Sequence, residues 1–131
     1  MSSRTDSFPV ICIDFKKSRF RIHKNTLRML GSPDYIQLLV NPYDDNILAI
    51  RCSTKEDRLS HYVCLDRFPA KNSYELYSNS LATTLINGNR HLRHDYSYRF
   101  CGTLNRAHGI ALFYLDKAIP ISANEQEEVS V

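Results

Sequence analysis

The sequence predicts a small, β-rich α+β fold in which two pseudo-repeated strand–short helix–hairpin units share one core. Short segments alternate apolar and polar residues, as half-buried strands do. Two short helical segments are followed by the breaks Gly31 and Asn87-Gly88-Asn89. Two segments at an offset of 74 − 20 = 54 residues also match position by position. The 131 residues have room for one domain, or for two very small ones with a common core.

The first unit, residues 8–52, contains the expected order strand, turn, strand, short helix, loop and β-hairpin. Asn25 is the expected cap of the helix, and Gly31 stops it. The expected ranges are 8–15, 16–18, 19–23, 24–30, 32–34, and 35–41 with 47–52 around a turn at 42–46. The polar residues 53–60 form the connector.

The second unit, residues 62–122, follows the same pattern and precedes an acidic, mobile tail at 123–131. Its expected strand, helix, break, strand, turn and strand lie at 73–78, 79–86, 87–89, 96–101, 102–109 and 110–115. Phe20 to Leu27 matches Tyr74 to Leu81, and Ile47 to Ile50 resembles Ile110 to Phe113. The apolar positions persist between the units and the charges do not, which indicates that the first unit contacts the ligand.

The composition excludes several classes of protein. Hydrophobic residues make up 43% and charged residues 24%, as in an ordinary globular protein. No stretch approaches the roughly 20 apolar residues of a membrane span, and the first residues do not read as a signal peptide, so we expect a cytoplasmic protein without membrane contact. Four separated cysteines, most of them in apolar runs, are expected to be buried reduced thiols.

The charge is uneven. Residues 1–124 carry 17 basic and 14 − 3 = 11 acidic side chains, a balance of +6. Six basic residues gather with no acidic residue between Asp14 and Asp34: Lys16, Lys17, Arg19, Arg21, Lys24 and Arg28. Strand alternation puts Arg19, Arg21 and His23 on one face, and the turn and the helix can extend it into one positive surface. Such a surface suits a nucleic acid, an acidic protein partner, or solvent alone.

A second basic segment, Arg90-His-Leu-Arg-His94, has a His-x-x-His spacing. Two histidines do not complete a zinc site, so we expect no metal and interpret Arg90 and Arg93 as a loop that touches phosphate or solvent. Tyr96, Tyr98 and Phe100 share one face of a strand; we expect core packing there, with stacking on unpaired bases as the alternative. No nucleotide-binding, hydrolase or cysteine-protease motif is present, so neither an enzyme nor a cofactor is expected.

Three segments carry a resemblance to a known family: Ser18-Arg-Phe-Arg-Ile-His-Lys-Asn-Thr-Leu-Arg-Met-Leu-Gly31, Tyr35-Ile-Gln-Leu-Leu-Val40 and Ile47-Leu-Ala-Ile-Arg51. Together they resemble the AbrB/MazE swapped-hairpin module, and a tandem of two modules resembles the MraZ arrangement. The resemblance implies intertwined dimers and DNA binding by transition-state regulators and antitoxins. A PC4-like sheet that binds single-stranded nucleic acid is a fainter resemblance.

We therefore predict a non-enzymatic DNA-binding protein that forms a homodimer or higher homo-oligomer and grips the phosphate backbone. Its expected contacts are Lys16, Lys17, Arg19, Arg21, Lys24, Arg28, Arg90 and Arg93, with Arg19 or Arg21 reaching a base edge. The alternatives are a phage or mobile-element protein that inhibits a nucleic-acid enzyme, a single-strand binder, and a nuclease with scattered carboxylates.

Overall fold

The structure is a computed structural model that describes residues 8–41, 43–64 and 72–121. Strands dominate these residues, with two α-helices and two short 3-10 helices. In chain order the elements are β1 (Val10–Asp14), β2 (Arg19–His23), α1 (Lys24–Met29), β3 (Tyr35–Asn41), β4 (Asp44–Ser53), β5 (His61–Tyr62), β6 (Ser73–Tyr77), α2 (Asn79–Gly88), β7 (Ser97–Asn105), η3 (Arg106–His108), β8 (Ile110–Tyr114), η4 (Leu115–Lys117) and β9 (Ile119–Ile121). The predicted β-rich α+β class is confirmed.

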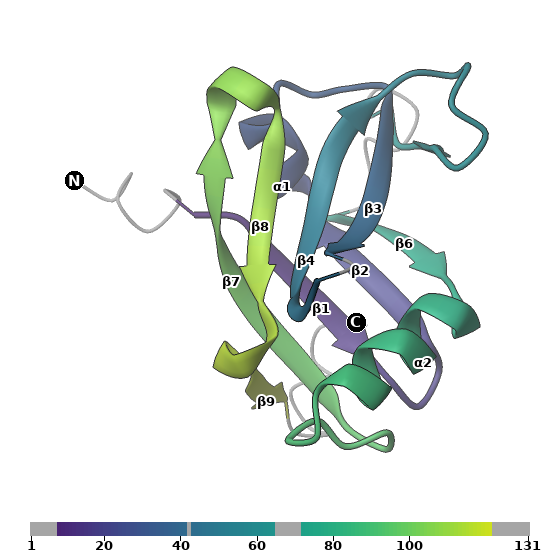
Figure 1. Cartoon of the computed structure of the whole chain (residues 1–131). Helices are drawn as coiled ribbons and strands as arrows, with labels where there is room; N and C mark the ends of the chain where they lie inside the picture. The colour runs from purple at the N-terminus through teal and green to yellow at the C-terminus, as the bar shows by residue number, and fades with distance from the viewer. Residues whose placement is uncertain (1–7, 42, 65–71, 122–131) are drawn as a thin grey trace.

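The strands form one antiparallel sheet in the order β5-β3-β4-β8-β7-β1-β2-β6, with β9 also beside β7. Strand β7 connects the two parts of the sheet, because its residues 97–101 pair with β1 whereas its residues 102–105 pair with β8. Gly102 lies where the partner changes, and a Cβ there would collide with the Leu112 carbonyl oxygen and lie 2.8 Å from Phe113 Cδ1. Glycine therefore permits this close approach. The sheet as a whole is curled (Figure 1).

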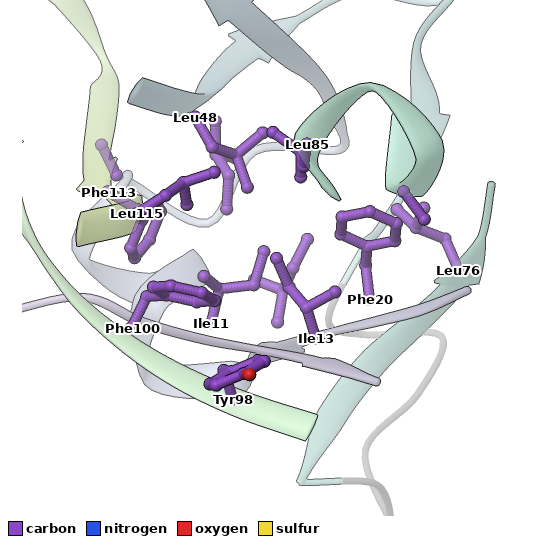
Figure 2. Packing of buried hydrophobic residues seen from close by; sticks show 14 of the residues in the cluster. Ile11, Ile13, Phe20, Leu48, Leu76, Leu85, Tyr98, Phe100, Phe113 and Leu115 are labelled. Atoms are coloured by element: carbon purple, nitrogen blue, oxygen red, sulfur yellow. The ribbon is translucent and has the colours of Figure 1, made fainter. Parts of the chain in front are cut away.

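The inner side of the curled sheet holds one hydrophobic core, to which both predicted units contribute. Phe20 of β2, Phe100 of β7 and Phe113 of β8 are fully buried, and α2 adds Leu85. Figure 2 shows these side chains converging from several strands, with Leu85 reaching them from the helix. Each buried side chain of this size stabilises the fold by about 1.5–3 kcal/mol, so core burial provides the main driving force for this architecture.

The two helices start differently. The expected Asn25 cap is wrong, because α1 starts at Lys24 behind His23 and has no side-chain cap. Thr26 instead ties α1 to β1: its hydroxyl accepts from the Val10 N–H at 2.8 Å and donates to the Val10 carbonyl at 3.0 Å. In α2, the Ser78 hydroxyl accepts from the third backbone N–H of the helix, as a serine N-cap should.

Some expected elements differ from the observed ones. Residues 102–109 were expected to form a turn, but β7 extends to Asn105, because pairing with β8 outweighs the turn preference of Gly102. The short strands β5 and β9 were not expected. All four cysteines are free, as expected, but partly exposed rather than buried. Residues 123–131 lie outside the described residues, and no described helix is long and apolar enough to cross a bilayer.

Candidate nucleic-acid interface

Strand β2 divides its side chains between the core and the surface. Phe20 and Ile22 are fully buried, whereas Arg19 and Arg21 are partly exposed and His23 is exposed. This is the period-2 alternation predicted from the sequence, and it is confirmed. The basic side chains of β2 therefore point away from the core.

Neighbouring strands extend this outward surface in rows. One row, running across β7, β1, β2 and β6, consists of Arg99, Cys12, Arg21 and Glu75. The next consists of Ser97, Asp14, Arg19 and Tyr77, of which Ser97 and Asp14 are buried. We call these eight residues the arginine face.

The two arginines of β2 are neutralised by carboxylates from other parts of the chain. Arg21 Nε donates to Glu75 Oε2 at 3.0 Å, and Arg19 Nη2 lies 3.5 Å from Asp14 Oδ2. The side chains of Arg21 and Arg19 are only 13% and 18% exposed. The expectation that this stretch is free of local neutralisation is wrong for these two residues, because strand pairing brings Glu75 and Asp14 beside them.

The turn before β2 carries Lys16 and Lys17, whose ammonium groups make no ion pair with the part of the chain that the structure describes. Asp14 Oδ1 accepts from the backbone N–H of Lys16 at 3.0 Å and of Lys17 at 3.2 Å. Ser18 closes the turn with a left-handed backbone, φ 54°. Both lysine residues are exposed. Since the carboxylate holds their backbone rather than their side chains, the turn is fixed while the positive charges remain available to a ligand.

Helix α1 places its basic residues at the other end of β2. Lys24 is partly exposed, and exposed Arg28 donates from Nη1 to Asn25 Oδ1 at 3.1 Å. Five strand residues at about 3.3 Å each separate the helix from the Lys16–Lys17 turn, or about 16 Å. The two groups thus lie at opposite ends of the β1–β2 hairpin (Figure 1), joined by the arginine face rather than gathered together.

The loop between α2 and β7 lies at the turn end of the arginine face. The Phe15 N–H donates to the Tyr96 carbonyl at 3.1 Å and so joins this loop to the Lys16–Lys17 turn. Arg93 is exposed, with its Cζ 5.0 Å from the Tyr96 ring centre and its Nε 3.5 Å from Asp95 Oδ1. Arg90 is also exposed on this loop. The structure thus joins two basic segments that are remote in sequence.

Arg99 is a candidate that the sequence prediction missed. It is exposed, and it stands directly opposite Cys12, on the other side from Arg21. The sequence pattern did set Arg99 apart from the aromatic side of its strand, but the pairing of β7 with β1 has no local signal. The arginine face therefore has three arginines rather than two.

Two residues on or beside the arginine face, Cys12 and His23, have shifted pKa values. Desolvation lowers the pKa of His23 below its usual 6.5, and nearby Arg99 and Arg21 lower it further. Burial raises the pKa of the Cys12 thiol above 9.0, although the same two arginines oppose that shift. Both results reflect a partly desolvated surface with positive charge around Cys12.

The remaining candidates have structural partners. Within the described ranges, no group of three or more His, Cys, Asp or Glu side chains could hold a metal ion. His91 Nε2 lies 2.6 Å from the Leu115 carbonyl oxygen. Tyr98 and Phe100 are buried in the core, as expected, whereas Tyr96 is 43% exposed.

No family model, curated protein sequence or solved structure matches this chain.

Proposed function

We propose that this protein is a non-enzymatic DNA-binding protein of the transcription-regulator or antitoxin kind, which holds phosphate groups against the arginine face and the adjoining turn. The observation that carries the proposal is the arrangement at the turn. Lys16 and Lys17 extend from a backbone fixed by Asp14, and the Tyr96 carbonyl joins them to the loop that carries Arg93. Fixed backbone with free cationic ends is suited to phosphate contacts, which position a protein on nucleic acid without reading its sequence.

The charge balance supports this proposal. The arginine face, the turn and the adjacent loop hold seven Lys and Arg side chains and three carboxylates, a net charge of 7 − 3 = +4. These are Lys16, Lys17, Arg19, Arg21, Arg90, Arg93 and Arg99 against Asp14, Glu75 and Asp95. Arg19 and Arg21 contribute less to the positive potential of this surface than Lys16 and Lys17, because the arginines are ion-paired and the lysines have no carboxylate partner among the described residues. We therefore assign the main phosphate contacts to Lys16, Lys17 and Arg99, and a supporting role to Arg19 and Arg21.

Two exposed tyrosines favour single-stranded nucleic acid as a second candidate ligand. Tyr77 is 64% exposed and lies opposite Arg19 on the neighbouring strand, and Tyr96 is 43% exposed beneath Arg93. Aromatic rings beside cationic groups are the usual combination for binding unpaired bases by stacking. Duplex DNA would use the same cations without the rings.

We further propose that the two units are related by an internal pseudo-two-fold axis, as a tandem of swapped-hairpin modules would be. Strand β2 pairs with β6, and Arg21 lies opposite Glu75, at 75 − 21 = 54 positions along. Strand β4 pairs with β8, and Ala49 lies opposite Leu112, at 112 − 49 = 63 positions along. Both offsets are the ones that align the units in the sequence. Antiparallel pairing of equivalent strands around equivalent residues supports the repeat.

The proposed function is tested by the salt dependence of binding. Fluorescence anisotropy would give the affinity for a duplex and for a single strand of equal length between 50 and 200 mM salt, a range in which phosphate contacts weaken strongly. Each phosphate contact contributes about 0.9 to the slope of log K against log salt for duplex and about 0.7 for a single strand. A slope of several units supports the proposal, and the tighter ligand identifies the binding mode. Absence of binding at low salt, together with a protein partner that survives nuclease treatment in a pull-down, would support the rival protein-inhibitor function.

A further inference from the structure

Arg21 and Arg99 flank Cys12 on the outward surface. In the strand register, Cys12 of β1 lies opposite Arg21 on one side and opposite Arg99 on the other. Neighbouring strands are about 4.8 Å apart, so the two arginine backbones are separated by about 9.6 Å. The side chains of Arg21 and Arg99 therefore lie on either side of the small Cys12 side chain, with Arg99 exposed and the Arg21 side chain 13% exposed.

The charged groups beside Cys12 leave donors available. Arg21 uses its Nε for Glu75, which lies on the side away from Cys12, and this bond fixes the guanidinium; its two Nη groups have no hydrogen bond to the rest of the described chain. Asp14 is in the next row, where it binds the turn backbone and Arg19. Within the described residues, Arg99 has no ion-pair partner. Cys12 thus has a cationic group on each side, and the nearest carboxylates, Glu75 and Asp14, have partners of their own.

We propose that Arg21 and Arg99 together bind one phosphate group of the nucleic acid, above the Cys12 thiol. This inference rests on the proposed function and names one position at which the protein binds the phosphate backbone of the nucleic acid. Guanidinium groups bind phosphate through paired hydrogen bonds of about 2.8 Å, and two of them on opposite sides of one phosphate satisfy oxygens on both sides. The arrangement gives Arg21 a role despite its ion pair, because Glu75 orients it toward the phosphate. Adjacent His23 adds a further polar contact at one edge.

Substitution of Arg99 tests the site against a matched control. Arg99→Gln should weaken oligonucleotide binding by about tenfold and reduce the salt slope by about 0.7–0.9, since one charge-assisted contact is lost. Arg99→Lys should recover part of the slope but not the full affinity, because an ammonium cannot form the paired bonds. The control is Arg106→Gln, an exposed arginine just beyond the far end of the same strand. Equal losses in the Arg99 and Arg106 variants would overturn the proposed site.

Cys12 supplies a second, local measurement. With a saturating oligonucleotide, alkylation of Cys12 by iodoacetamide at pH 8.5, followed by mass spectrometry, should slow several-fold. Cys52 is the internal control, because its sulfur lies 3.2 Å from the Leu30 carbonyl at the α1 end of the fold. An oligonucleotide that binds by anisotropy but leaves the Cys12 rate unchanged would overturn the phosphate site and leave the proposed function standing. Absence of any oligonucleotide binding would overturn both the phosphate site and the proposed function. Slower alkylation of Cys12 with inorganic phosphate alone would support the site with free phosphate as its ligand.

Discussion

Replacing Lys16 and Lys17 by glutamine should weaken nucleic-acid binding without weakening the fold. Both side chains are exposed, and the turn is held by backbone N–H groups that donate to Asp14 at 3.0 and 3.2 Å. Glutamine retains these backbone bonds and removes two charges. Two lost phosphate contacts lower the salt slope by about 2 × 0.7 to 2 × 0.9, or about 1.4–1.8. The free energy of unfolding should change by less than about 0.5 kcal/mol, as for other surface substitutions.

The assay is fluorescence anisotropy over a salt series, with a urea titration to measure unfolding. The matched control is the pair Lys55→Gln and Arg58→Gln, which removes two exposed charges from the connector between β4 and β5. The control should retain the wild-type slope. A slope that is the same in wild type and in the Lys16/Lys17 variant, or one that falls equally in the control, would refute the assignment of these contacts.

Four further predictions concern single residues. Glu75→Gln should tighten oligonucleotide binding at low salt, because the glutamine oxygen can still accept from Arg21 Nε and orient it while a negative charge is removed from the arginine face; unchanged or weaker binding by anisotropy would argue against this face. Gly102→Ala should lower the free energy of unfolding in urea by about 1–3 kcal/mol, since the added Cβ meets the backbone of β8; an unchanged urea midpoint would show that the bend needs no glycine. Ser18→Gly should raise the urea midpoint by the equivalent of about 0.5–1 kcal/mol, because φ is 54° there, and a loss of stability would contradict the left-handed turn. Folding lowers the pKa of His23, so the unfolded state binds a proton at this residue first as the pH falls below 6.5, and the free energy of unfolding should then decrease. His23→Gln should reduce this loss of stability between pH 7.5 and 5.5. An identical loss in the variant would exclude His23 as its source.

The sequence predicted those elements that depend only on residues close together in the chain. Arg19 to His23 alternates with a period of two, and the strand has those bounds in the structure. The C-terminal ends of the two helices coincide with the expected breaks: α1 ends at Met29, shortly before Gly31 with φ 91°, and α2 ends at Gly88. Gly102 misled the prediction, because a glycine in a turn and a glycine at a close strand crossing look alike in a single sequence.

The features of the candidate site that the sequence did not predict depend on pairing between strands that are far apart in the chain. Glu75 is 54 positions from Arg21, and only the register of β2 with β6 brings their side chains together. The same holds for Arg99, whose relation to Cys12 depends on the pairing of β7 with β1. The local count of charges around Arg21 therefore overestimated its free positive charge, while the contribution of Arg99 was missed.

The most direct test is to map the bound surface residue by residue by NMR. Backbone amide shifts of the isotope-labelled protein, followed as an oligonucleotide is added, report which strands contact it. We predict that the largest shifts fall on Lys16, Lys17, Arg21 and Arg99 and on the loop that carries Arg93. Shifts confined to the β3–β4 hairpin, or no shifts at saturating oligonucleotide, would contradict a nucleic-acid interface on this side of the sheet.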